Sequence, residues 1–423
     1  MRSPDTKDEV ADLVSEIEAA ARRLHGVAAR TPLQPSPRLS ERYGAQVYLK
    51  REDLQAVRSF KIRGAYNAIA ALGDRAQARG VVCASAGNHA QGVAAACALG
   101  GIRSTIFMPT VTPNQKVARV RHFGGEQVDV RLVGDTYDDA GAAAEQFAAT
   151  TGALPVHPFD DPLTIAGQGT IGQELLDDLP GGPDVVVAAI GGGGLIAGVA
   201  GAVTSQRPAT CVFGAEPAGA PSMTEALRAG GPVTLREIDH FVDGAAVRCV
   251  GRLTFRLCQE LVDRVVVVPE GKVCTTVVDL YQDDGIIAEP AGALAIAALE
   301  DLRSEIAGRS VVCLLSGGNN DILRYPEILE RSLVYEGRKH YFVIEFAQKP
   351  GQLRQFVDQA LGPTDDIVRF EYMKKTEKER GAALVGIELQ DPQDLEPLIG
   401  RMREVGINFR RLSSNELLYD YVI

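Results

Sequence analysis

The hydrophobic and polar positions of the first 333 residues alternate between two patterns. Short runs rich in β-branched residues predict strands at 46–49, 80–84, 104–108, 127–132, 185–190, 210–215, 265–268 and 310–315. Ala-rich segments, or segments with helical spacing, predict helices at 61–71, 89–99, 113–123, 137–150, 164–179, 195–205 and 291–306. This alternation is typical of an α/β fold with parallel sheets that helices cover on both faces. The length of the segment suggests two such sheets.

The last 90 residues follow another order. Strands are expected at 340–346, 367–372, 383–389 and 408–412, and helices at 351–361 and 395–405. This βαββαβ order is that of ferredoxin-like α+β domains. The segment holds only 7 of the 44 glycines but 10 of the 24 Tyr and Phe residues, which predicts a domain boundary between 333 and 334. An α/β part at 1–333, with a smaller subdomain at about 55–155, would then precede an α+β part at 334–423.

Composition and charge exclude several classes of protein. Lys plus Arg number 44 against 55 Asp plus Glu, so the net charge is −11, and without a basic run a nucleic acid is not an expected partner. No apolar stretch approaches the ~20 residues that span a bilayer, and the polar N-terminus is not a secretory signal. The seven cysteines are odd in number and form no CxxC pair. They favour reduced thiols in a cytoplasmic protein over disulfides or a zinc site.

One candidate for chemistry is Lys61, in the segment Ser59-Phe60-Lys61-Ile62-Arg63-Gly64 at the start of a predicted helix. The positive end of the helix dipole disfavours an ammonium group there. A neutral amine is what Schiff-base or proton-transfer chemistry needs. The alternative is an ordinary solvated lysine.

Three further candidates are turns that follow predicted strands, where open α/β sheets bind their ligands. Ser85-Ala86-Gly87-Asn88-His89 offers backbone N–H groups to a carboxylate or phosphate; Asn88 is either a helix N-cap or part of the chemistry, and His89 is interpreted as a packing or orienting residue. Gly191-Gly192-Gly193-Gly194-Leu195 has the ingredients of a phosphate cradle, the alternative being a flexible turn. Ser316, in Ser316-Gly317-Gly318, either hydrogen-bonds a bound ring or belongs to an ordinary turn.

The segments SFKIRGA, SAGNHAQG, GGGGL, EPAGA and LSGGN occur in the order found in one enzyme family. Over residues 20–330 the chain resembles the serine/threonine dehydratases of the tryptophan-synthase-β type, which are fold-type-II enzymes that use pyridoxal 5'-phosphate. The last 90 residues resemble the ACT-like regulatory domain of the biosynthetic threonine dehydratases. The resemblance implies a pyridoxal phosphate cofactor and the deamination of L-threonine to 2-oxobutanoate and ammonia, the first step of isoleucine biosynthesis. L-serine is a further candidate substrate.

The same resemblance assigns roles to the candidate residues. Lys61 would hold the cofactor as a Schiff base and take the Cα proton of the substrate. Asn88 would bond the ring hydroxyl oxygen, the four glycines and the leucine after them would hold the phosphate, and Ser316 would face the pyridine nitrogen. The substrate carboxylate would lie on the backbone N–H groups of Ser85 to His89. Because a hydroxyl keeps the ring nitrogen less protonated than a carboxylate would, Ser316 favours loss of the β-hydroxyl group over transamination.

Two positions differ from the similar serine racemases. Ala86 stands where they carry a serine that serves as a base, so racemisation is expected to be poor. Ser222 stands where they have an acidic cation ligand, so no metal is expected in the loop that begins at Glu216. Glu289, in the EPAGA segment, matches a family element near the cofactor ring, although Pro290 equally suits the first turn of a helix.

The resemblance further implies that isoleucine inhibits the enzyme through the C-terminal domain, that valine opposes it, and that the chains form a homotetramer. Binding at a distant site would then bias a two-state oligomer. A simpler hypothesis is a domain that serves dimerisation alone. For the whole chain, the competing hypotheses are threonine synthase, cysteine synthase, a broad serine/threonine dehydratase and a non-catalytic amino-acid sensor. One methyl group contributes only ~1–3 kcal/mol to discrimination, which leaves the choice between threonine and serine open.

Overall fold

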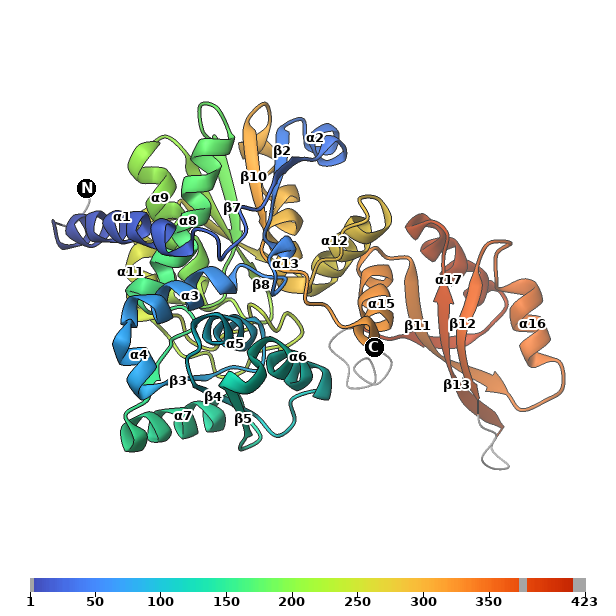
Figure 1. Ribbon diagram of the computed structural model, residues 1–423. Coiled ribbons are helices and arrows are strands. Elements are labelled where there is room, and N and C mark those ends of the chain that lie inside the picture. Colours follow the sequence, from blue (N-terminus) through green and yellow to red (C-terminus); the bar gives the residue numbers. More distant parts are fainter. Residues whose placement is uncertain (1–3, 373–378, 414–423) are drawn as a thin grey trace. The chain divides into compact units, whose positions relative to one another are not determined.

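The structure is a computed structural model that describes residues 4–372 and 379–413 (Figure 1). Its internal contacts divide the chain into two compact units, Met1–Asn320 and Asp321–Ile423. Helix α15 (Tyr325–Tyr335) belongs to the second unit, so the composition change at 334 lies inside that unit. The assignment of separate domains to 1–333 and 334–423 stays a prediction.

A six-stranded sheet forms the centre of the first unit. Its strands in spatial order are β1 (Leu33–Pro35), β2 (Gln46–Arg51), β10 (Ser310–Leu315), β7 (Val185–Ala189), β8 (Cys211–Pro217) and β9 (Arg264–Val268). Neighbouring strands are parallel, except that β1 is antiparallel to β2. Every residue of β7 is buried. Its continuous apolar sequence follows from this position, because a parallel strand covered on both faces has no solvent side.

A second, smaller parallel sheet lies in the same unit. Its strands in spatial order are β5 (Val128–Leu132), β4 (Ser104–Met108), β3 (Val81–Ala84) and β6 (Leu154–Pro155). Two parallel sheets of this kind confirm the predicted α/β class. Strands β1 and β6 were not predicted because they are only 3 and 2 residues long, which is too short for a recognisable β pattern.

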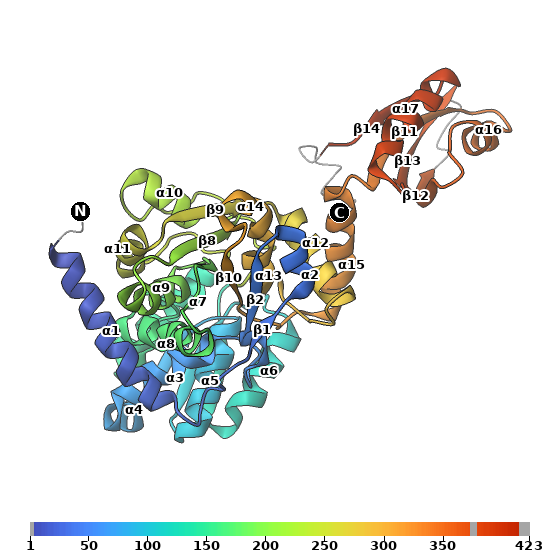
Figure 2. The same ribbon diagram turned by 90° about the horizontal axis from the view of Figure 1, so that it is seen from above.

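The helices of the first unit include those that were predicted and several that were not. They are α1 (Pro4–Leu24), α2 (Pro37–Tyr43), α3 (Lys61–Leu72), α4 (Asp74–Arg79), α5 (Asn88–Gly100), α6 (Asn114–Gly124), α7 (Tyr137–Thr151), α8 (Pro162–Asp178), α9 (Gly194–Gln206), α10 (Ser222–Ala229), α11 (Arg252–Leu261), α12 (Glu270–Gln282), α13 (Pro290–Ala297) and α14 (Arg303–Ile306). Helix α1 runs along α8 and α9 (Figure 2). Val10, Leu13 and Ile17 are buried on one face of it, at the helical spacing that could have predicted it.

The prediction of a single helix over 291–306 is wrong. The chain forms α13, a 3₁₀ turn at Ala298–Glu300 and then the short α14. The backbone N–H of Asp301 bonds the oxygen of Ala298, and that of Leu302 bonds the oxygen of Leu299. Because these bonds span three residues in place of four, the last turn tightens and the helix ends.

The second unit contains a four-stranded antiparallel sheet. In chain order its elements after α15 are β11 (Lys339–Ala347), α16 (Gln352–Gln359), β12 (Asp366–Tyr372), β13 (Arg380–Glu388), α17 (Leu395–Glu404) and β14 (Asn408–Arg411). The strands lie in the order β12-β13-β11-β14, and every neighbouring pair is antiparallel. The predicted βαββαβ order is therefore confirmed. Phe342, Ile344, Phe356 and Leu398 form the fully buried centre of its core.

Across the described ranges, no helix is both long and apolar enough to cross a membrane. The seven cysteines are reduced thiols, and five of them are buried.

Candidate active site

Lys61 is the first residue of α3, and its side chain is partly buried. Its Nζ donates a hydrogen bond to the backbone oxygen of Pro158, at 2.9 Å. Burial lowers the pKa of Lys61 to about 8, although the carboxylate of Glu289 acts in the opposite direction. The amine is therefore neutral and nucleophilic at a lower pH than that of a solvated lysine. The alternative of an ordinary solvated lysine does not fit this position.

Backbone hydrogen bonds connect the start of α3 to the turn that follows β10. Ser59 and Gly317 form an isolated β-bridge, and the backbone N–H of Phe60 donates to the backbone oxygen of Ser316 at 3.1 Å. The fold therefore brings the lysine segment and the Ser316 segment together across more than half of the chain. Arg58, which precedes them, has a φ of 57°, a left-handed conformation that costs a non-glycine residue about 1–2 kcal/mol.

The four glycines form a tightly packed turn between β7 and α9, and this packing does not favour the alternative of a flexible turn. A Cβ atom on Gly192 would lie 2.2 Å from the ring of Phe159, and one on Gly191 would lie 3.0 Å from Cα of Ala245. Gly193 has a φ of 93°, which a side chain would disfavour. Helix α9 begins at Gly194. The backbone N–H groups of its first residues, which have no partner inside the helix, therefore lie at the end of the glycine turn.

The segment 157–160 joins the lysine to the glycine turn. Pro158 accepts the hydrogen bond of Lys61, and the next residue, Phe159, packs on the glycines. Asp160 then accepts three backbone N–H bonds from the first turn of α11, at 2.9–3.1 Å. In the same turn, Thr254 donates its hydroxyl to the backbone oxygen of Gly192 at 2.7 Å. Phe159, Asp160 and Thr254 were not among the predicted site residues, because they act only through packing and backbone bonds.

Asn88 is the first residue of α5, and the N-cap is Gly87, so the interpretation of Asn88 as an N-cap is wrong. Its side chain bonds other segments: Nδ2 donates to Oε1 of Glu289 at 2.6 Å, and Oδ1 accepts from Nδ2 of Asn319 at 2.7 Å. His89 bonds the backbone oxygen of Val156 through Nε2 at 2.9 Å. Burial lowers the pKa of His89 to about 3, so the ring is neutral and suits an orienting role.

Ser316 lies directly after β10 and is buried. Among the described residues its hydroxyl makes one hydrogen bond, a long one of 3.4 Å to the backbone oxygen of Ala291. The hydroxyl of Ser59 beside it is buried and has no hydrogen-bond partner among the described residues. Two hydroxyl groups with such weak internal bonding retain capacity for a bound molecule.

Pyridoxal phosphate fits these residues. The glycines carry no side chains that could cover their backbone N–H groups, and N–H groups at a helix start suit a phosphate. Lys61 supplies an amine for the aldehyde, Asn88 keeps one amide N–H unused, and the Ser316 hydroxyl is able to meet a ring nitrogen. The backbone of the 85–89 turn begins where β3 ends, which suits the carboxylate of an amino acid.

The loop at Glu216 is held by protein groups. The carboxylate of Glu216 accepts the backbone N–H groups of Met223 and Thr224, at 2.6 and 2.9 Å, and the hydroxyl of Thr224. The hydroxyl of Ser222 bonds the backbone oxygen of Val247. Glu216 thus caps the first turn of α10. Within the part of the chain that the structure describes, no three or more His, Cys, Asp or Glu side chains gather as a metal site would require.

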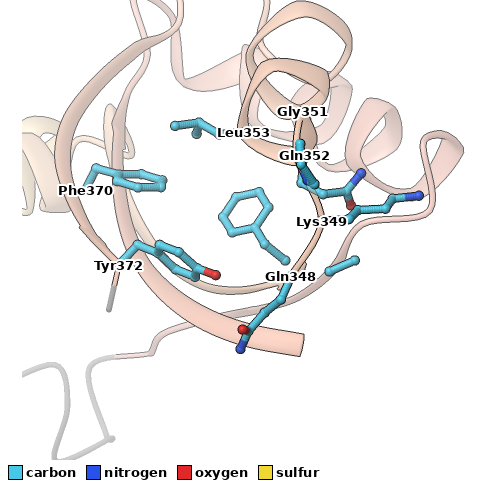
Figure 3. A pocket seen from close by; sticks show the side chains of 10 residues that line it. Gln348, Lys349, Gly351, Gln352, Leu353, Phe370 and Tyr372 are labelled. Atoms are coloured by element: carbon cyan, nitrogen blue, oxygen red, sulfur yellow. The ribbon is translucent and has the colours of Figure 1, made fainter. Parts of the chain in front are cut away.

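The second unit has a pocket of its own (Figure 3). It measures about 390 Å³ and lies where β11, the start of α16 and the end of β12 meet. Its lining residues are Phe346, Ala347, Gln348, Lys349, Pro350, Gly351, Gln352, Leu353, Phe370 and Tyr372. Aromatic and aliphatic side chains face backbone and amide groups across it, as in sites for small amphipathic molecules.

The fold and the comparisons with known proteins define a class of enzyme. Residues 25–317 match the family model of pyridoxal-phosphate-dependent enzymes, and residues 330–422 match that of the C-terminal regulatory domain of threonine dehydratase. An L-threonine dehydratase, biosynthetic IlvA, from Halalkalibacterium halodurans is 50% identical over 410 residues, which cover 97% of this chain and 99% of that protein. The chain therefore belongs to the threonine dehydratase family of pyridoxal-phosphate-dependent enzymes.

Solved structures agree with this assignment. The processed form of threonine deaminase isoform 2 from Solanum lycopersicum is 41% identical, with a TM-score of 0.73, and the match covers 77% of this chain and 94% of that one. Maize serine racemase is 32% identical, with a TM-score of 0.70, over 76% of this chain and 98% of that one. The resemblance to fold-type-II enzymes and the expected cofactor are confirmed.

Proposed function

We propose that the protein deaminates L-threonine to 2-oxobutanoate and ammonia in the cytoplasm, as the first step of isoleucine biosynthesis. The observation that carries this proposal is the 50% identity to a biosynthetic threonine dehydratase over 97% of the chain. That identity extends over the catalytic pocket and the C-terminal unit together. The partly buried amine of Lys61, beside a glycine turn and a strand-end loop, supports the same chemistry.

Pyridoxal phosphate supplies an electron sink that stabilises negative charge on Cα of a bound amino acid. The chain's own residues do the rest. Lys61 would bind the aldehyde and would later hold the Cα proton on Nζ, which its lowered pKa permits. The N–H groups of the 85–89 turn bind and orient the carboxylate. Gly191 to Gly194 and Leu195 would hold the phosphate, Asn88 would bond the ring oxygen and Ser316 would bond the ring nitrogen.

The test is an assay with a single substrate. With L-threonine alone, the purified enzyme loaded with cofactor is expected to release 2-oxobutanoate and ammonia in equal amounts. The ratio of kcat/KM for threonine to that for serine separates a specific from a broad dehydratase. D-serine is expected to form poorly from L-serine, because Ala86 offers no hydroxyl as a base. A protein that releases no oxo acid without a second substrate would overturn the proposal.

We further propose that isoleucine inhibits the enzyme by binding the pocket of the second unit, that valine opposes it, and that the enzyme is a homotetramer. Phe346, Leu353, Phe370 and Tyr372 suit an aliphatic side chain. The N–H groups at the start of α16 and the ammonium group of Lys349 suit the carboxylate of an amino acid.

A negative charge in this pocket is expected to oppose isoleucine. In a Leu353→Asp variant, half-maximal inhibition should need at least about 10-fold more isoleucine, since the new carboxylate repels that of the effector. Each rate is measured relative to the same variant without effector. Val357→Asp is the control, because Val357 lies on the same helix and is similarly exposed, 43% against 47% for Leu353, but does not line the pocket. Equal loss of inhibition in both variants would exclude this pocket.

A further inference from the structure

None of the steps proposed above involves the carboxylate of Glu289. It precedes α13 and is 5% exposed. Its backbone N–H donates to the oxygen of Gly317 at 3.1 Å. The carboxylate itself lies against the Ser316 turn, since a Cβ atom on Gly317 would be 2.2 Å from its Oε1. No described cation forms an ion pair with it, which is costly for a buried charge.

The carboxylate controls which way the Asn88 amide faces. Glu289 accepts one N–H of Asn88 at 2.6 Å, and the opposite end of that amide, Oδ1, accepts from Nδ2 of Asn319 at 2.7 Å. Asn319 is fixed in turn by a bond from the same nitrogen to the backbone oxygen of Val57, at 2.8 Å. A carboxylate only accepts and an amide oxygen cannot donate, so this network permits one orientation of Asn88. A single N–H of that amide then remains for a ligand.

We propose that Glu289 is a positioning residue, which through Asn88 aims the remaining amide N–H at the ring oxygen of the bound cofactor. The inference rests on cofactor binding, which the family establishes, and on the proposed role of Asn88. It does not depend on which amino acid is the substrate.

Burial and the surrounding charges bring the pKa of Glu289 close to neutral pH. Burial, followed by the charge of Asp243, raises its pKa to about 7, while the bond from Asn88, the charge of Lys116 and the backbone N–H of Asn319 act in the opposite direction. Lys116 and Asp243 are paired with each other at 2.5 Å, so their effects largely cancel. Below about pH 7 the carboxyl is neutral, and above it the charge faces the Asn88 amide and raises the pKa of Lys61.

A further cation lies within electrostatic reach of this group. Arg119, on α6, has its pKa lowered by burial and by Arg58, and Glu289 raises it. Its guanidinium group favours the ionised form of the Glu289 carboxyl. A pH response near 7 that Glu289→Gln removes is attributable to the carboxyl of Glu289.

The experiment follows the absorption of the bound cofactor between pH 6 and 8, without any amino acid, and the dissociation constant of the cofactor. The wild-type spectrum is expected to change with a midpoint near 7, and Glu289→Gln should abolish that change, because the amide keeps the acceptor for Asn88 but cannot ionise. Glu289→Ala, which also removes the acceptor, is expected to weaken cofactor binding about 10-fold, and Glu289→Gln less than about 3-fold.

A second buried carboxylate provides the matched control. Burial raises the pKa of Glu216 to about 7 as well, but its partners are the residues at the start of α10. Glu216→Gln should therefore keep the wild-type spectral midpoint. A Glu289→Gln protein with that same midpoint, or a Glu289→Ala protein with wild-type affinity, would overturn the proposal. If Glu289→Ala does not fold, as circular dichroism would reveal, the Glu289→Gln spectrum decides alone. A wrong substrate assignment leaves all of these readouts unchanged.

Discussion

A Lys61→Ala variant is expected to lose roughly 10⁴-fold or more in kcat/KM for threonine, because it lacks both the nucleophilic amine and the proton acceptor. Its purified form should also lack the visible absorption of a cofactor bound as an imine. The measurement combines the oxo-acid assay with the absorption spectrum after addition of excess cofactor. The fold should survive, since Nζ makes a single hydrogen bond to a backbone oxygen.

Lys272→Ala is the control for this experiment. Lys272 lies on α12 and pairs with Asp301 at 2.8 Å, away from the residues of the proposed site. Its removal is expected to cost about 1 kcal/mol of stability or less and to leave the spectrum intact. A Lys61→Ala protein that keeps the spectrum and a rate within tenfold of wild type would show that another amine carries the cofactor.

The second large effect concerns Arg63, two residues after the lysine. Its guanidinium forms two bonds to Glu52, both at 2.8 Å, and two to Glu174, at 2.7 and 3.0 Å. Arg63 and Glu52 are almost fully buried, and Lys50, which is also buried, bonds Glu174 at 2.6 Å. Arg63→Met should lower the free energy of unfolding by about 3–5 kcal/mol, because it leaves buried carboxylates without a partner.

Denaturant unfolding at two pH values checks this prediction and its cause. Burial raises the pKa of Glu52, but Arg63, with smaller contributions from Thr31 and Lys50, outweighs burial, so the net shift of the pKa is downward. In wild type, Glu52 therefore stabilises the fold above its unfolded pKa, and that contribution is lost as the pH falls. Without Arg63 the buried carboxyl has a raised pKa, and protonation relieves the penalty. The difference in the free energy of unfolding between wild type and the Arg63→Met variant should therefore be smaller at acidic pH.

A surface arginine provides the comparison. Arg256 bonds Glu9 at 2.8 Å, and its side chain is 48% exposed. Arg256→Met should change stability by about 1 kcal/mol or less, because solvent screens the pair. If Arg63→Met lowered the free energy of unfolding no more than Arg256→Met does, the buried network would not stabilise the start of α3.

The local pattern of hydrophobic and polar residues was enough to predict most of the fold. The strands that became β7 and β10 are continuous runs of β-branched and aliphatic residues, and such runs leave little choice of structure. The βαββαβ order of the second unit also followed from periodicity. The pattern failed where an element is too short to show a period, as in β6, or where backbone bonds end a helix whose side chains favour it, as after α13.

The order of the motifs was likewise readable along the chain, and through it the cofactor and the family. The contacts were not, because hydrogen bonds depend on distance in space. The bond between Asn88 and Glu289 joins residues 201 positions apart, and no local pattern reports it. The lowered pKa of Lys61 arises from burial by segments far away in the chain. The amino-acid sequence alone thus determined which elements and chemical groups are present, whereas only tertiary packing decided which groups meet and which of them lose their solvent.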